Sequence, residues 1–407
     1  MNSIDRKKGF LGTSKAIWRD PRTWLFLLAV TEKSIFRYMM LVLTMVTGIE
    51  DIGVVVMHIA YIVLIAMCIK RGSKFKGADI CIILFFTLSI IATWLIYPDN
   101  IEKYMIGEGQ LWPTVFPALR FFIVGLFIIP NKETIDLVGK VSCLAILAET
   151  LFILLILRGS DMQNNDDMSR AYSLLLSVLF VINYAYDKRS LVGLVFALIG
   201  ILSLLSMGTR GPIMIILAFV AAKIFQSSTK KGKGYIVIVV LLLLMWFVSS
   251  PYWNAFLFLL RGIISALGMS TRIIDYTIQG ETLSNYSERD DIYALLINKI
   301  QERPLTGWGV YGEWQFVDWS AHNMYLEVLI HYGVIIGGLI LLWMLYLAVK
   351  AFMTSKVAPV RGLVLMFACN VFVRGVFGGT FLSFPTFLMI GFCLQICRKT
   401  NFKYLIA

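Results

Sequence analysis

The chain contains three histidines, and one of them, His322, stands beside Asn323 where a tryptophan-rich loop becomes a long apolar run. With Ser320 as N-cap, the pattern predicts a helix whose first turn holds His322. The positive end of a helix disfavours imidazolium, so we expect a neutral imidazole that can act as a general base at a water boundary. A structural histidine, hydrogen-bonded at the membrane interface, is the alternative interpretation.

The remaining histidines are weaker candidates for chemistry. His331 lies deeper in the same apolar run, and His58 lies alone in another, so we expect structural roles for both. Glu327 is an acid inside the predicted helix. It either holds a neighbouring polar group or stays protonated, and the sequence leaves both open.

Four arginines, Arg120, Arg210, Arg289 and Arg374, fall on one side of the membrane in the topology derived below. A guanidinium binds phosphate oxygens in a bidentate manner, so several on one side indicate an anion site. The alternative for each arginine is that it extends to the lipid headgroups or pairs with an acid.

Arg289 lies in the segment SERDDIYALLINKIQERP, which reads as a helix in a loop. Ser287 is the expected N-cap, and Asp290 completes a capping box. The first turn of a helix disfavours a cation by about 0.3–1 kcal/mol, which favours a ligand for Arg289. An apolar face predicts that the helix packs on another element. This face consists of Ile292, Leu295, Leu296 and Ile300.

The composition indicates the elements that carry these residues. Of 407 residues, 58% are hydrophobic and 15% are charged. Apolar runs of about 20 residues recur, and each is long enough to cross a bilayer. The sequence therefore predicts an all-α polytopic membrane protein. Its net charge of +12 is assigned to orientation in the membrane, and nucleic-acid binding is not expected. The cysteine spacing predicts neither disulfides nor a zinc site.

We expect about twelve transmembrane helices. The first, at 34–49, is the weakest, because Glu32, Lys33 and Arg37 interrupt a longer span; an interfacial helix at 20–31 is expected before it. The others are expected at 52–70, 78–97, 114–130, 134–158, 169–187, 190–208, 211–226, 235–250, 322–349, 362–378 and 381–397. Residues 1–250 then hold nine spans, residues 251–321 form a long loop with short helices, and residues 322–407 hold three spans.

The loops alternate between basic and acidic or mixed composition. Basic loops, such as those at 70–76 and 230–233, are expected in the cytoplasm by the positive-inside rule. Both termini are then cytoplasmic, and the loop at 251–321 faces outward together with His322.

The stretch GWGVYG at 307–312 formally matches the pattern GxGxxG. A dinucleotide site would need a preceding strand and an acid about 20 residues later, so these glycines instead predict a turn. Four aromatic residues nearby either stack on sugars or form part of an interfacial belt. They are Trp308, Tyr311, Trp314 and Trp319.

Three motifs together resemble the O-antigen ligase and polymerase superfamily over roughly 207–340: SMGTRGP, ERDDIYALLINKIQERPLTGWGVYG and AHNMYLEVLIHYGVIIGG. The resemblance implies a GT-C-like fold of about twelve helices in the bacterial inner membrane. It implies transfer of glycans from undecaprenyl diphosphate on the outer face, with no metal, nucleotide or other cofactor.

The resemblance also implies roles for individual residues. His322 would deprotonate the acceptor hydroxyl, and Arg210 and Arg289 would hold the diphosphate and stabilise its developing charge. A further set is expected at the substrate, the first two on the ground of sidedness alone. The set is Arg120, Arg374, Asn323, Arg303, Trp308 and Tyr311.

The leading interpretation is a polymerase of lipid-linked repeat units, and an O-antigen ligase acting on a lipid A-core acceptor is the second. The expected partners are the lipid-linked donor, the acceptor glycan and, in the cell, a flippase and a chain-length regulator. A transporter would also carry intramembrane arginines, but we find no internal repeats of the kind typical of transporters. A scaffold without catalysis would leave the arginine and histidine pattern unexplained.

Overall fold

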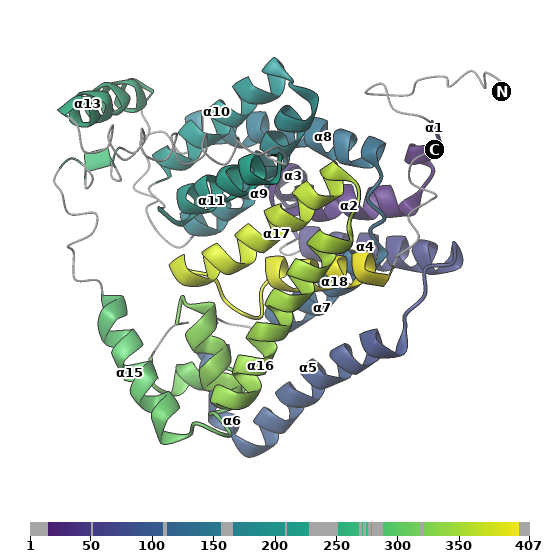
Figure 1. Ribbon diagram of the computed structural model, residues 1–407, viewed down its shortest axis with the longest axis vertical. Helices are drawn as coiled ribbons and strands as arrows, with labels where there is room; N and C mark the ends of the chain where they lie inside the picture. The colour runs from purple at the N-terminus through teal and green to yellow at the C-terminus, as the bar shows by residue number, and fades with distance from the viewer. Residues whose placement is uncertain are drawn as a thin grey trace. The chain divides into compact units, whose positions relative to one another are not determined.

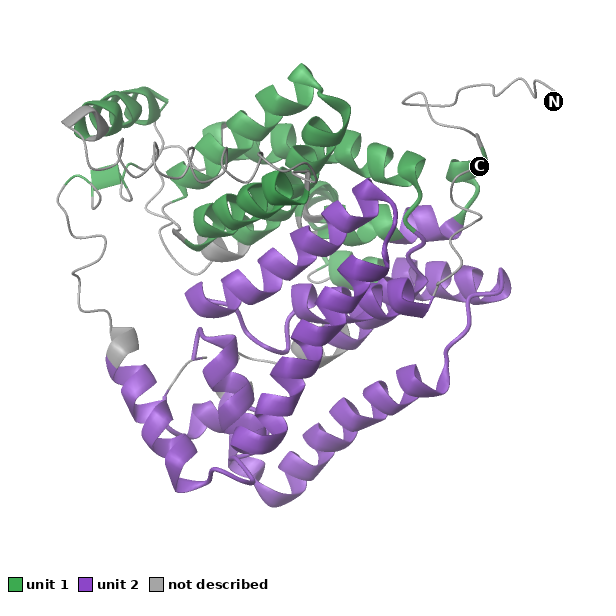
Figure 2. Ribbon diagram, in the orientation of Figure 1, with its two compact units in different colours: residues 1–20, 26–58, 130–285 green, residues 21–25, 59–129, 286–407 purple. Residues whose placement is uncertain are grey.

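The computed structural model describes residues 15–49, 52–108, 112–155, 166–207, 210–227, 251–267, 271, 274, 275, 278, 288–317 and 321–398. Every element among these residues is helical, as the apolar runs predicted. The chain divides into two compact units, which are coloured separately in Figure 2. Unit 1 comprises residues 1–20, 26–58 and 130–285, and unit 2 comprises residues 21–25, 59–129 and 286–407.

The helices of unit 1 are α1 Lys15–Trp18, η2 Glu32–Phe36, α3 Arg37–Thr47, α8 Lys132–Leu155, α9 Asp166–Lys188, α10 Leu191–Ser206, α11 Arg210–Ser227 and α13 Pro251–Ala266. Those of unit 2 are α5 Gly77–Ile96, α6 Pro98–Glu108, α7 Trp112–Phe127, α15 Glu288–Glu302, η3 Gly312–Gln315, α16 Met324–Thr354, α17 Ala358–Phe377 and α18 Phe384–Arg398. The residues of α2 Pro21–Thr31 and α4 Ile52–Lys70 divide between the units.

Within the part of the chain that the structure describes, five helices are long and apolar enough to cross a membrane by length and composition. They are Ile52–Lys70, Gly77–Ile96, Lys132–Leu154, Met324–Thr354 and Ala358–Phe377. Of six shorter apolar helices among these residues, five lie at other predicted spans, whereas Asn254–Ala266 lies in the segment expected to form the long loop. The span expected at 235–250 lies outside the described residues. The helices therefore fit a multi-pass membrane protein, while the number of about twelve spans stays a prediction.

The start of the chain differs from expectation. An interfacial helix at 20–31 and a break at Glu32 were expected, yet α2, η2 and α3 follow one another directly. The stretch Glu32–Phe36 is a π-helix, which absorbs the polar residues without ending the helix. Most side chains of α2 are buried, and Phe26 contacts Phe180 of α9 edge to face. Helix α2 thus contributes to the packed core.

The core of unit 2 is built on close helix contacts. A Cβ atom added at Gly391 of α18 would lie 2.2 Å from the carbonyl oxygen of Phe122 in α7. Likewise, a Cβ atom at Gly125 would lie 2.5 Å from the carbonyl oxygen of Leu388. These glycines let the two backbones approach, as small residues do between membrane helices. Helix α16 packs on α17 and α18, and α15 packs beside α16 (Figure 1).

Within unit 2, the loop before α16 lies at one end of α5. Lys74 precedes α5 and Glu102 follows it in α6, so about 30 Å of helix separates the two. Arg303 of the loop donates a hydrogen bond to the Tyr97 hydroxyl at that second end, over 2.8 Å. The loop and the basic segment around Lys74 therefore lie at opposite ends of a candidate membrane span.

This arrangement predicts the labelling of exposed cysteines. In a variant without native cysteines, Glu102→Cys and Thr306→Cys should react with an impermeant maleimide on intact cells, because their end of α5 is expected to face outward. Lys74→Cys should react only after the membrane is broken. Labelling of Lys74→Cys from outside, with Thr306→Cys protected, would invert the topology.

Candidate functional site

His322 lies two residues before α16, because the helix begins at Met324. The side-chain oxygen of Asn323 accepts hydrogen bonds from the backbone N–H groups of Tyr325 and Leu326, at 3.0 and 3.2 Å. Asn323 is therefore the N-cap, and the expectation that Ser320 caps a helix containing His322 was wrong. Asparagine satisfies two of the free N–H groups of the first turn, which fixes the helix start at this residue.

The backbone of His322 is in the left-handed region, with φ of 48°. A residue other than glycine is uncommon there, and such a conformation costs about 1–3 kcal/mol. Conformations of this kind cluster at functional sites. The imidazole is partly exposed and lies beside the positive end of α16. Its place suits the role of general base that the sequence predicted.

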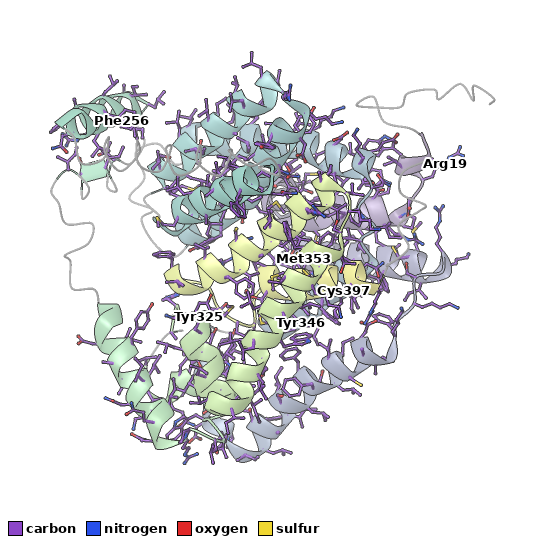
Figure 3. The ribbon with its side chains drawn as sticks, in the orientation of Figure 1. Arg19, Phe256, Tyr325, Tyr346, Met353 and Cys397 are labelled. Atoms are coloured by element: carbon purple, nitrogen blue, oxygen red, sulfur yellow. The ribbon has the colours of Figure 1, made fainter. Side chains whose placement is uncertain are left out.

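Arg374 lies in the last turn of α17, and this turn packs on the first turn of α16. The hydroxyl of Tyr325, labelled in Figure 3, donates a hydrogen bond to the Phe372 carbonyl over 2.8 Å. A Cβ atom added at Gly375 would lie 3.0 Å from the terminal methyl group of Met324. The structure thus brings the end of α17 that carries Arg374 to the segment that follows His322.

Arg120 of α7 lies at the same end of unit 2. Its guanidinium carbon is 4.1 Å from the ring centroid of Tyr61 and 4.7 Å from that of Phe121. Phe121 packs in turn on Phe384, with 4.2 Å between the ring centroids, where α18 begins. In the turn before α18, the backbone N–H of Phe381 donates a hydrogen bond to the carboxyl group of Glu327 in α16. Arg120 is therefore placed on aromatic rings near the start of α16.

Arg210 and Arg289 each lie in the first turn of a helix. Arg210 is the first residue of α11 in unit 1, and Arg289 is the second residue of α15 in unit 2. The helix predicted around Arg289 is confirmed, while its proposed cap Ser287 lies outside the described residues. Of the expected apolar face, Leu296 and Ile300 are buried against Ala321 and Ile330, whereas Leu295 is exposed.

The turn expected from GWGVYG is confirmed, and it docks into a kink of α16. Gly333 interrupts the helix with φ of 75°, which frees two carbonyl groups of the preceding turn. The backbone N–H groups of Trp308 and Gly309 donate to the carbonyls of Ile330 and His331, at 2.7 and 3.1 Å. A Cβ atom at Gly307 would lie 2.6 Å from the backbone nitrogen of Gly333, so glycine is required there.

Side chains of α5 and α6 hold the same turn from the other side. The amide nitrogen of Asn100 donates to the carbonyls of Trp308 and Val310, at 2.8 and 3.2 Å. The hydroxyl of Thr93 accepts from the N–H of Val310 over 2.9 Å. Polar backbone groups of the loop are thereby satisfied inside unit 2, which fixes the loop to the helices.

The side chains of Arg303 and Trp308 contact each other. The guanidinium carbon of Arg303 is 3.9 Å from the ring centroid of Trp308, and Phe316 meets the same indole edge to face at 4.9 Å. The Trp308 indole N–H donates to the Lys299 carbonyl over 2.8 Å. Both side chains were expected at the substrate, and both remain partly exposed, so a substrate contact by either stays a prediction.

Tyr311 also differs from the expected sugar contact. Its side chain is 3% exposed, and its ring stacks on Tyr104 with 3.9 Å between centroids. Burial, followed by the nearby Tyr104 and Glu313, raises the pKa of the Tyr311 hydroxyl well above its usual value. Tyr311 is therefore a neutral packing residue here, because the chain turns inward at its positive φ of 61°.

A buried polar cluster lies behind this loop. Nε2 of His331 is 2.7 Å from Oε2 of Glu313 and accepts from the backbone N–H of Tyr311 over 3.0 Å. Glu327 completes the group, and one oxygen or nitrogen atom of each residue lies within 4.8 Å of the others. The separation would suit a metal ion. However, backbone N–H groups of Tyr311 and Phe381 already donate to His331 and Glu327, and they oppose a cation.

Unit 1 contains polar groups that sequence reasoning missed. The guanidinium carbon of Arg170 in α9 is 4.6 Å from the ring centroid of Phe152, and its buried Nε and Nη1 atoms have no hydrogen-bond partner among the described residues. Glu149, one turn from Phe152 in α8, is buried and accepts from the Tyr38 hydroxyl over 2.5 Å. The rule that intramembrane charges are functional candidates would have singled out both residues.

Residues 194–342 match the family Wzy_C, described as O-antigen ligase. No curated protein matches the chain. The match covers all of α11, α13 and α15 and the part of α16 up to residue 342, and it includes Arg210, Arg289 and His322. The matched segment supports the resemblance to the O-antigen ligase and polymerase superfamily, whose members are glycosyltransferase-like enzymes that act on polyprenyl-linked glycans.

Proposed function

We propose that this protein joins oligosaccharide repeat units carried on undecaprenyl diphosphate, at the outer face of the bacterial inner membrane. The observation that carries the proposal is the left-handed, partly exposed His322 beside the capped start of α16, within the segment that matches the family. Residue patterns at 251–321 and the basic loops support the outward side.

The proposed reaction is a displacement at the anomeric carbon of the donor glycan. His322 takes the proton of the acceptor hydroxyl, whose oxygen then bonds to that carbon. The bond from the same carbon to the diphosphate oxygen breaks, and the lipid diphosphate leaves with the electron pair. Arg210 and Arg289 offset the charge that develops on the diphosphate, and His322 returns its proton to water. No metal or cofactor takes part in this scheme.

Arg120 and Arg374 are proposed to extend the anion site. Support comes from their shared position at the end of unit 2 where α16 begins. Asn323 is proposed to serve the substrate indirectly, because its side-chain oxygen caps α16 and so fixes the residue before it. Arg303, Trp308 and Tyr311 are left as residues that shape the loop.

The second candidate function is ligation of the same glycan to lipid A-core, because the description of the matched family names a ligase. The acceptor distinguishes the two functions, so it decides the experiment. Purified protein given only polyprenyl-diphosphate-linked repeat units should form carrier-linked chains of two or more repeats. Glycan transfer that appears only after lipid A-core is added would instead identify a ligase, and His322→Ala serves as the inactive control.

A further inference from the structure

The cluster of Glu313, Glu327 and His331 is the most deeply buried group of ionisable side chains near the proposed site. Their exposed fractions are 0%, 3% and 1%. Two carboxyl groups so close together in buried surroundings cannot both be ionised unless a cation lies between them. Backbone N–H groups point at His331 and Glu327, so a proton is the cation that fits.

The cluster joins three segments of unit 2. Glu313 belongs to η3 of the loop, whereas Glu327 and His331 are four residues apart on one face of α16. Phe381, which donates to Glu327, belongs to the turn between α17 and α18. His322 lies in the chain between Glu313 and Glu327, and Arg374 lies at the end of α17 just before that turn.

We propose that Glu313, Glu327 and His331 are positioning residues, which share a proton and thereby hold His322 and Arg374 in place for glycan transfer. This inference rests on the proposed function. None of the three residues touches the reacting atoms. They act by fixing the loop, the first two turns of α16 and the turn after α17 to one another.

The shared proton gives the inference a specific test at Glu327. Glutamine has the shape of a protonated glutamate, accepts from Phe381 and donates to Glu313, so Glu327→Gln should keep kcat within about threefold of the wild type. Leucine at position 327 would leave the Phe381 N–H without an acceptor and Glu313 without a donor. Glu327→Leu should lower kcat per folded molecule by about 10–100-fold, with KM for the lipid-linked donor nearly unchanged.

A matched control exists elsewhere in unit 2. Asp79 is fully buried at the start of α5 and accepts two hydrogen bonds from Arg398, one of them over 2.7 Å. Asp79→Leu likewise removes a buried carboxylate, but far along the chain from the loop. It should lower the thermal unfolding temperature in detergent and leave kcat per folded molecule unchanged, which separates positioning from stability.

Three outcomes would overturn the inference. Glu327→Leu with the kcat of the wild type would show that the cluster only stabilises the fold. Glu327→Gln as impaired as Glu327→Leu would show that the charge, and not a shared proton, is required. If divalent cations raise the unfolding temperature of the wild type but not that of the Glu327 variants, the cluster binds a metal. If His322→Ala is fully active, the proposed function fails instead.

Discussion

Replacing His322 by alanine is expected to lower the rate of glycan transfer by about 10²–10⁴-fold, the usual effect of losing a general base. The variant should still insert and fold, because a partly exposed side chain before the helix start supports little packing. The measurement is the formation of carrier-linked glycan by purified protein in detergent.

His58→Ala is the matched control for this prediction. His58 hydrogen-bonds to the carbonyl of Val54 in its own helix, at 2.7 Å, and it lies outside the segment that matches the family. The control should retain full transfer. Turnover of His322→Ala equal to that of His58→Ala would remove His322 from the reaction, and the strained backbone at that residue would then need another explanation.

Arg210→Lys should reduce transfer by about 10²-fold even though the positive charge is kept. A lysine is a single point charge, and it cannot present two parallel N–H groups to the oxygens of a diphosphate. Arg289→Lys should have a smaller effect in the same direction, because a loop helix can readjust. Initial rates at several donor concentrations separate a loss in kcat from a loss in KM.

Arg261→Lys is the matched control for Arg210→Lys, because the ion-pair partner of Arg261 is known. Arg261 of α13 pairs with Asp275 over 2.7 Å, and its side chain is about half exposed. Arg261→Lys should transfer glycan at the rate of the wild type. If Arg210→Lys also works normally, Arg210 is an interfacial charge and the diphosphate is held elsewhere.

The sequence by itself determined the local structure around the site. Apolar periodicity and polar breaks located α4, α5, α15 and α17 within a few residues, and the turn at 307–312 followed from its glycines. These features depend on residues at most a few positions apart, which a linear pattern records. The same pattern misplaced the start of α16, because Ser320 and Asn323 are both good caps and only one can form.

Only the tertiary structure decided which distant residues meet. Glu313 and His331 are 18 positions apart, and Asn100 contacts the Trp308 carbonyl across 208 positions. The burial of Tyr311, one of the expected sugar contacts, and the pairing of Arg303 with Trp308 also arise from packing. Periodicity assigns a residue to a helix face, but which element covers that face depends on how the kink at Gly333 and the close glycine contacts let helices approach.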